Sequence, residues 1–248
     1  AAAAQRSGRA GDFSTSVDVG PLYGALLAAQ FAEMWDVLRT RGADAFELVE
    51  AGAGNGRLAR DVLDAAAGEH PDFYRHVRVT LVERAGRARD AQAEVLAPHA
   101  ARLAECRADL PSKVTGAIYA TELLDALTVH IVARLGGELR EIAVTKRGGR
   151  LVETDVPIST PAVLDALGAP GAAPLEEGTR IVVGPAATDW VARAAGALRA
   201  GFLLLFDYGR ERAADPGARP AGTVTAYRRH HALHDGWLER PGEQDLTS

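Results

Sequence analysis

The sequence predicts an α/β fold with a mostly parallel, Rossmann-like sheet and an antiparallel insertion after its fourth strand. Two patterns carry this expectation. Short apolar segments alternate with amphipathic segments through residues 46–123, and segments separated by glycine pairs follow between 131 and 154. Alternating strands and helices form parallel sheets through right-handed crossovers, whereas strands joined by tight glycine turns pair antiparallel.

The first half of the chain is expected to supply four strands and three helices. Apolar residues at intervals of three or four predict the helices, and short apolar runs predict the strands. The third helix should stop near Pro98, because proline cannot continue a helix. The expected helices span 20–40, 56–68 and 87–100, and the expected strands span 46–52, 77–84, part of 101–110, and 116–123.

After Leu127 the pattern becomes that of an antiparallel meander, followed by a stretch rich in proline and glycine over 157–178. We expect one domain over 1–248, with a core at 42–127 and 179–230 and an inserted substrate-side subdomain at 128–178. The remaining expected elements are a strand at 179–185, a helix at 188–201, a continuously buried strand at 202–209 and a last strand at 222–229.

Composition narrows the class of protein. The chain has 248 residues, 47% hydrophobic and 25% charged, which is typical of a globular protein. Its net charge is −5 and its basic residues are dispersed, so we expect no nucleic-acid partner. No apolar run approaches the roughly 20 residues that cross a bilayer. The single cysteine, Cys106, suits a reducing cytoplasm. The first residue is not methionine, so we expect terminal segments to be missing.

The segment VEAGAGNGRLARD (49–61) joins a predicted strand to a predicted helix. Glycines let the backbone approach a ligand closely at the carboxyl edge of the sheet. A dinucleotide fingerprint would need glycine at position 57, which is Arg57, whereas E-x-G-x-G-x-G is the spacing expected for S-adenosylmethionine. The expected cofactor contacts are Glu50, Gly52, Ala53, Gly54 and Gly56.

Acidic residues follow the next two strands. Glu83 ends the second strand, where a carboxylate could accept both hydroxyls of a ribose, or could instead cap the following helix. Asp109 and Leu110 follow the third strand and are expected beside the adenine. Asp109 could equally be a turn residue before Pro111.

The fourth strand leads into Glu122 and Asp125, which would share a face if the segment turned helically. Paired carboxylates beside a methyl donor favour a cationic acceptor, because a guanidinium forms forked hydrogen bonds with them. We assign both residues as catalytic and expect Glu122 also to contact the cofactor. In the alternative, the two residues cap a helix and pair with an arginine.

Four further residues are candidates for binding the substrate: Asp207, Tyr208, His130 and Arg228. Asp207 and Tyr208 end a predicted strand on the ligand edge, and His130 follows the acidic segment. A cluster of histidines at His230, His231 and His234 lacks a carboxylate or thiolate to complete a ligand set, so we expect no metal.

Seven segments are similar to the MidA-like family of S-adenosylmethionine-dependent methyltransferases, and they occur in the family's order. That family includes a mitochondrial complex I assembly factor that symmetrically dimethylates an arginine. The similar segments are GDFSTSVDVGPLYG (11–24), LVEAGAGNGRLARD (48–61), LVER (81–84), ATELLDALTVH (120–130), LLLFDYG (203–209), GTVTAYRRHH (222–231) and PGEQDLT (241–247).

This resemblance implies a class I methyltransferase fold, S-adenosylmethionine as cofactor and S-adenosylhomocysteine as product. It places the cofactor loop on Gly52–Gly56 and the ribose carboxylate on Glu83. Phe13 and Thr15 belong to a Gly-Asp-Phe-x-Thr segment that is expected to close over the cofactor. The chain departs from the family at three positions, where Thr121 replaces asparagine, Thr128 replaces proline and Ala25 replaces glutamate.

The expected activity is therefore methyl transfer to a nitrogen, most simply a protein arginine. The departures keep a small-molecule, biosynthetic methyltransferase open as an alternative, and a non-catalytic assembly factor with the same fold as another. A nicotinamide-dependent oxidoreductase fits poorly, because the third glycine is one residue early. The expected partner is a methyl-acceptor protein or small molecule, with a homodimer as an open question and no membrane contact.

Overall fold

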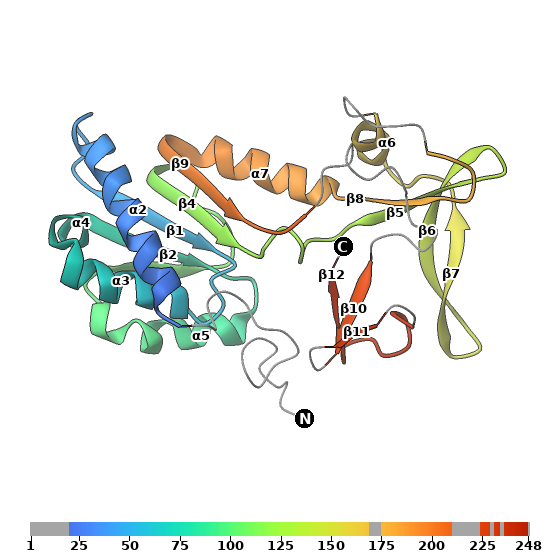
Figure 1. Cartoon of the computed structure of the whole chain (residues 1–248), viewed down its shortest axis with the longest axis horizontal. Coiled ribbons are helices and arrows are strands. Elements are labelled where there is room, and N and C mark those ends of the chain that lie inside the picture. The colour runs from blue at the N-terminus through green and yellow to red at the C-terminus, as the bar shows by residue number, and fades with distance from the viewer. Residues whose placement is uncertain (1–19, 169–174, 210–223, 229–230, 234–235, 248) are drawn as a thin grey trace. The chain divides into compact units, whose positions relative to one another are not determined.

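The computed structural model describes residues 20–168, 175–209, 224–228, 231–233 and 236–247 (Figure 1). The chain divides into two compact units. One, here called the sheet unit, comprises 14–123 and 191–207, and the other, here called the insertion unit, comprises 1–13, 124–190 and 208–248. The chain passes from one to the other after Leu123, within one helix and after Asp207.

The sheet unit contains a five-stranded sheet in the order β3-β2-β1-β4-β9. Every neighbouring pair is parallel, which confirms the predicted fold class. Parallel strands end at the same edge of a sheet, so the segments that follow β1, β2 and β4 share that edge. The strands are β1 Phe46–Ala51, β2 Val77–Val82, β3 Leu103–Arg107, β4 Val114–Thr121 and β9 Leu198–Phe206.

Helices cover this sheet, and two of them, α2 and α3, lie side by side in Figure 1. The predicted helices are confirmed with small shifts in their ends. A short additional helix, α4, precedes β2, and α7 begins before its predicted start because Pro185 suits a first helical turn. The helices are α2 Leu22–Arg39, α3 Arg57–Glu69, α4 Pro71–His76, α5 Gly86–Val95, the 3₁₀ turn η1 Ala97–His99 and α7 Pro185–Ala197.

The core lies between α2, α3 and the sheet. The large buried side chains of α2 are Leu27, Phe31, Trp35 and Leu38, which recur every three or four residues. Leu26 is 62% exposed because it falls one residue outside this stripe. Burial of these large side chains is the main source of stability for the unit.

Gly24 allows α2 to touch the backbone of α3. A Cβ atom at Gly24 would lie 2.6 Å from Cβ and 2.8 Å from the carbonyl carbon of Asp61. Real Cβ atoms do not approach other atoms so closely, so only glycine permits this packing. The contact holds the start of α2 against the start of α3.

The prediction that the strand over 202–209 is the most continuously buried is wrong. β4 holds that place, with Ala117, Ile118 and Tyr119 fully buried, whereas no residue of β9 is buried. The reason is topological, because β4 lies inside the sheet and β9 at its edge. β9 also begins earlier than expected, since Leu198 already pairs with Val114.

The insertion unit contains an antiparallel sheet in the order β7-β6-β5-β8, which confirms the predicted meander. Val132, Val163 and Val183 form its small core. A three-stranded antiparallel sheet, β11-β10-β12, lies in the same unit. The elements of the insertion unit are β5 His130–Leu135, β6 Glu138–Arg147, β7 Arg150–Val156, α6 Pro161–Leu167, β8 Arg180–Val183, β10 Thr225–Arg228, β11 His231–Leu233 and β12 Asp245–Thr247.

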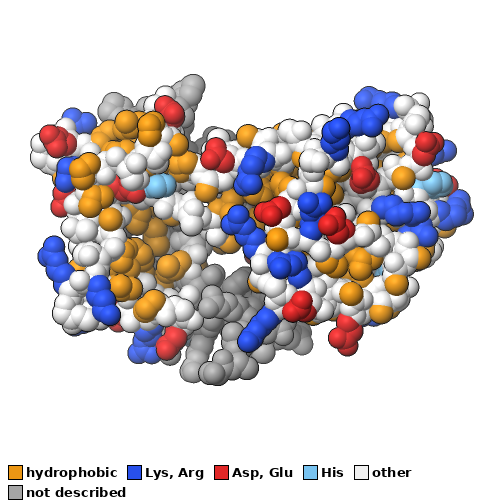
Figure 2. Space-filling model, turned by 180° about the vertical axis from the view of Figure 1, so that it is seen from behind, with side chains coloured by type: hydrophobic (Ala, Val, Ile, Leu, Met, Phe, Trp, Pro, Cys, Tyr) orange, Lys and Arg blue, Asp and Glu red, His pale blue; other side chains and the backbone are white. Residues whose placement is uncertain are grey.

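The surface carries mixed charge. Figure 2 shows acidic and basic side chains interspersed on the face drawn there. None of the described helices combines the length and the apolar character needed to cross a membrane.

Candidate functional site

The glycine loop is attached to the end of β2. The backbone N–H groups of Gly52 and Ala53 both donate to the carbonyl oxygen of Val82, over 2.9 and 3.1 Å, and the N–H of Gly56 donates to Ala53 over 2.8 Å. The loop therefore turns directly beside the residue that follows Val82, which is Glu83.

Positive φ angles make glycine necessary in this loop. Gly52, Gly54 and Gly56 have φ values of 73°, 52° and 86°, in the left-handed region that side chains disfavour. At Gly56 a Cβ atom would also lie 2.9 Å from Leu81 Cδ1. At Gly54 it would meet nothing within 4 Å, so open space lies over the middle of the loop.

Glu83 bridges the glycine loop and the start of α5. Its Oε2 accepts a hydrogen bond from the N–H of Gly54 over 3.0 Å, and its Oε1 accepts one from the N–H of Ala85 over 2.8 Å. The structure thus shows the helix-start contact that was the alternative to ribose binding. Each carboxylate oxygen can accept a second hydrogen bond, so the two roles are compatible.

Gln92, which no sequence pattern indicated, completes the support of the loop. It is fully buried on α5, and its Nε2 donates to the carbonyl oxygen of Gly54 over 2.8 Å. Both backbone groups of Gly54 are therefore held by side chains. The burial of Gln92 is visible only in the structure, so the sequence offered no signal for this contact.

Glu50 lies beneath the loop and not on its surface. Its side chain is 5% exposed and accepts a hydrogen bond from the Tyr119 hydroxyl over 3.0 Å. Burial raises the pKa of Glu50 to about 8, while hydrogen bonds from Tyr119 and the backbone of Ala59 act in the opposite direction. Glu50 thus joins β1, β4 and the first turn of α3.

Glu122 has an unusual backbone. It follows β4 directly and has a φ of 49°, the only positive φ among the described residues other than glycine. Its N–H donates to the carbonyl oxygen of Phe206 over 2.8 Å. Left-handed conformations of non-glycine residues cost about 1 kcal/mol or more and concentrate at functional sites. No helix follows: residues 124–127 form one turn, so Glu122 and Asp125 neither cap a helix nor share a helical face.

Tyr23 is a second residue that the sequence analysis missed. Its hydroxyl lies 3.2 Å from Thr121 Oγ1, and its ring packs edge-to-face on Phe206 with 5.9 Å between centroids. Burial raises the pKa of Tyr23, and the charges of Glu122 and Glu50 add to this effect. Tyr23 continues the buried stripe of α2 by one turn, so its spacing indicated only a core residue.

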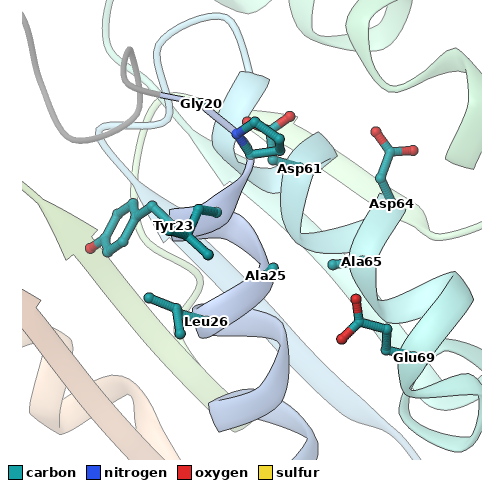
Figure 3. Close-up of a pocket in the computed structure, with 10 residues that line it drawn as sticks. Gly20, Tyr23, Ala25, Leu26, Asp61, Asp64, Ala65 and Glu69 are labelled. Carbon is teal, nitrogen blue, oxygen red and sulfur yellow. The ribbon is translucent and has the colours of Figure 1, made fainter.

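A pocket of about 760 Å³ lies along α2 and α3. Figure 3 shows Asp61, Asp64 and Glu69 of α3 on one side of it, and Tyr23 extending from α2 away from them. Burial raises the pKa of Asp61, and neighbouring Asp64 raises it further. The lining includes no residue of the glycine loop.

Asp125 and Tyr208 meet within the insertion unit. The Tyr208 hydroxyl hydrogen-bonds to Asp125 Oδ2 and lies 2.8 Å from Thr247 Oγ1. The end of β12 is thereby tied to a predicted catalytic carboxylate. Asp207, the neighbour of Tyr208, is exposed.

His130 has a structural partner. Its Nδ1 lies 2.7 Å from Glu141 Oε1, and Glu141 also accepts from the N–H of Ser159 over 2.9 Å. Burial alone would raise the pKa of Glu141, but these hydrogen bonds lower it below its ordinary value. The pair joins β5 to β6, and a role in substrate binding stays a prediction.

The structure gives only the positions of the other predicted site residues that it describes. Asp109 is exposed and Leu110 half-buried after β3, and Arg228 belongs to β10. Phe13 and Thr15 lie outside the described residues. Among the described residues, no group of three or more His, Cys, Asp or Glu side chains is placed to hold a metal ion.

These features define a class of protein. A parallel Rossmann-like sheet, a loop with glycines at alternate positions after β1 and a carboxylate after β2 are the framework of a class I methyltransferase. A family model described as "Putative S-adenosyl-L-methionine-dependent methyltransferase" matches residues 26–248, and the chain belongs to this family. The MidA-like resemblance is confirmed, and S-adenosylmethionine is the cofactor that the description of this family names.

Two solved structures are similar to this chain in sequence and fold. A crystal structure from Burkholderia thailandensis with S-adenosyl-homocysteine bound is 29% identical, with a TM-score of 0.83 over 99% of this chain and 62% of that one. A second structure from the same organism is 27% identical, with a TM-score of 0.78, and covers 94% of this chain and 61% of that one.

A curated relative from Drosophila melanogaster is named "Protein arginine methyltransferase NDUFAF7 homolog, mitochondrial". It is 29% identical over 157 residues, which are 55% of this chain and 35% of the relative. The matched segment thus spans about a third of that relative's length, and this chain covers about three fifths of the two crystal structures.

Proposed function

We propose that this methyltransferase acts on a nitrogen, and that the nitrogen belongs to a protein arginine. The observation that carries the proposal is Glu122, an acidic residue that directly follows β4 in a left-handed backbone conformation. The name of the Drosophila relative supports the same acceptor.

The described residues fit the cofactor. Open space lies over Gly54, and Glu83 retains capacity to accept hydrogen bonds from a ribose. The bound cofactor supplies a methyl group activated on a sulfonium. A new N–C bond forms at the acceptor as the S–C bond breaks, and the nitrogen then loses a proton to solvent.

Glu122 would orient the acceptor and stabilise its charge. A guanidinium and a carboxylate form two parallel, charge-assisted hydrogen bonds, which fix the direction of the reacting nitrogen. Positioning of this kind accounts for much of the rate enhancement in group transfer. Asp125 belongs to the insertion unit, and its part in catalysis stays a prediction.

The hydrogen bond from Tyr208 does not disqualify Asp125. A carboxylate has about four acceptor positions, so Asp125 can accept from Tyr208 and from a guanidinium together. Tyr208 would then hold Asp125 in one orientation.

The test is methyl transfer from labelled S-adenosylmethionine to a peptide that contains one arginine, with the lysine version of the peptide as control. We expect Glu122→Gln to lower the transfer rate by at least about 100-fold while leaving affinity for S-adenosylhomocysteine within a few-fold. Loss of cofactor binding in this variant would contradict the assigned role. Transfer to small amines and never to arginine would identify the small-molecule alternative.

A further inference from the structure

Tyr23 contacts two residues that adjoin Glu122. Thr121 precedes Glu122 in the chain, and Phe206 accepts the hydrogen bond from its N–H. The Tyr23 hydroxyl reaches the first of these and its ring packs on the second. A residue of α2, 98 positions away from Thr121, therefore braces the end of β4 from two sides.

We propose that Tyr23 is a positioning residue for methyl transfer, which acts through Thr121 and Phe206 to keep the Glu122 carboxylate aimed at the acceptor nitrogen. This inference rests on the function proposed above. The hydroxyl contributes by fixing the side chain of Thr121, and the ring contributes by fixing Phe206. Tyr23 itself needs no contact with the substrate.

The chemistry of the pair suits this role. The phenol is partly buried, and burial is the main cause that raises its pKa, so it is protonated and uncharged at neutral pH. A neutral O–H···O bond restrains geometry without adding a charge that would compete with Glu122 for a cationic acceptor. The positive φ of Glu122 calls for such restraint, because an unrestrained backbone there would relax to an ordinary conformation.

The close packing of α2 on α3 sets the reach of Tyr23. Gly24 follows it directly and touches the backbone of Asp61, so the start of α2 cannot shift along α3 without a clash. Figure 3 shows the Tyr23 ring leaving α2 on the side opposite Asp64 and Glu69.

The central experiment compares Tyr23→Phe and Thr121→Val with two matched variants. Thr121→Ser keeps a hydroxyl, and Tyr74→Phe removes a hydroxyl that bonds His99 over 2.9 Å elsewhere in the sheet unit. We expect Tyr23→Phe and Thr121→Val each to lower kcat by about 10- to 100-fold with little change in KM, stability or affinity for S-adenosylhomocysteine. Thr121→Ser should restore most of the rate, and Tyr74→Phe should leave it unchanged.

The double variant Tyr23→Phe, Thr121→Val tests whether the two hydroxyls act as one element. Coupled residues are not additive, so the double variant should be no slower than the slower single variant. Losses that multiply, or a Tyr23→Phe protein with wild-type kcat, would overturn the inference.

Fluorine NMR of protein labelled with 3-fluorotyrosine gives a readout that needs no acceptor. The Tyr23 resonance, assigned by its loss in Tyr23→Phe, should move in Thr121→Val and stay near its place in Thr121→Ser. An unmoved resonance in Thr121→Val overturns the contact and the inference with it.

The transfer assay distinguishes failure of the proposed function from failure of the role assigned to Tyr23. An inactive wild type that binds cofactor overturns the proposed function, and this inference with it. If the wild type is active and Tyr23→Phe has the same rate, only the role assigned to Tyr23 is overturned.

Discussion

Tyr119 on β4 donates a hydrogen bond to Glu50 on β1, and 3.0 Å separate the phenolic oxygen from Oε2. Both side chains are buried, so the bond lies in a low-dielectric interior beneath the glycine loop. A buried carboxylic acid in this position favours its neutral form, and the stability of the sheet unit should therefore depend on pH.

Replacement of Glu50 by glutamine should remove part of the pH dependence of the protein's stability. The pKa of Glu50 is about 8 in the folded protein against an ordinary value of 4.5, so the folded state holds its proton more tightly. The stabilising effect of that proton is complete below pH 4.5 and is lost as pH rises through 8. Relative to Glu50→Gln, the wild type should lose up to about 1.4 kcal/mol of unfolding free energy per pH unit in this window.

Urea unfolding at pH 5.5, 7.0 and 8.5 measures this difference, with the exposed Glu69→Gln as control. A gap between wild type and Glu50→Gln that does not vary with pH would refute the prediction.

Alanine at Gly56 should destabilise the protein and weaken cofactor binding. The substitution combines a φ of 86° with a Cβ atom 2.9 Å from Leu81 and 3.0 Å from Leu96. We expect a loss of about 2–4 kcal/mol. Gly54→Ala is the comparison, because its φ is also positive but its Cβ would meet open space, so it should lose only about 1 kcal/mol. Equal losses would show that packing at Gly56 is unimportant.

Glu83 should decide cofactor affinity. Glu83→Ala removes the acceptor for Gly54 and any acceptor for a ribose hydroxyl, so the Kd for S-adenosylhomocysteine should rise at least about 10-fold. Calorimetric titration measures it, with NADH as a ligand that should not bind and Glu94→Gln on the exposed side of α5 as the matched variant. If Glu83→Ala binds S-adenosylhomocysteine as tightly as the wild type, Glu83 does not bind the ribose and serves only to support the glycine loop.

Alanine at Gly24 should push α2 away from α3. A Cβ atom 2.6 Å from Asp61 must be relieved by movement of a helix backbone, which costs about 1–3 kcal/mol. Gly68→Ala, a helical glycine on α3 with no neighbour within 4 Å, should be neutral or slightly stabilising. Thermal unfolding of the two variants distinguishes them, and similar midpoints would contradict the prediction.

Local patterns in the sequence were enough to predict the framework. The order of strands and helices, the glycine loop and the position of Glu83 all follow from periodicity or from spacing within a few residues. Such features depend on the backbone near them, so a single sequence carries the information.

Contacts between distant segments could not be predicted in this way. Tyr23 meets Thr121, Gln92 meets Gly54 and His130 finds Glu141, and no local pattern reports these pairings. The burial of β9 was misjudged for a related reason. Its apolar composition resembles that of β4, but only the sheet order shows which of the two strands lies at the edge.

Under the proposed function, the backbone of Glu122 sets stability and activity against each other at one position. Glycine there would relieve the left-handed strain and should raise stability by about 1 kcal/mol, but would remove the carboxylate. Selection for higher thermodynamic stability alone would therefore replace Glu122. Laboratory evolution under heat without an activity screen should find position 122 early, and variants recovered that way should be stable proteins that no longer transfer a methyl group.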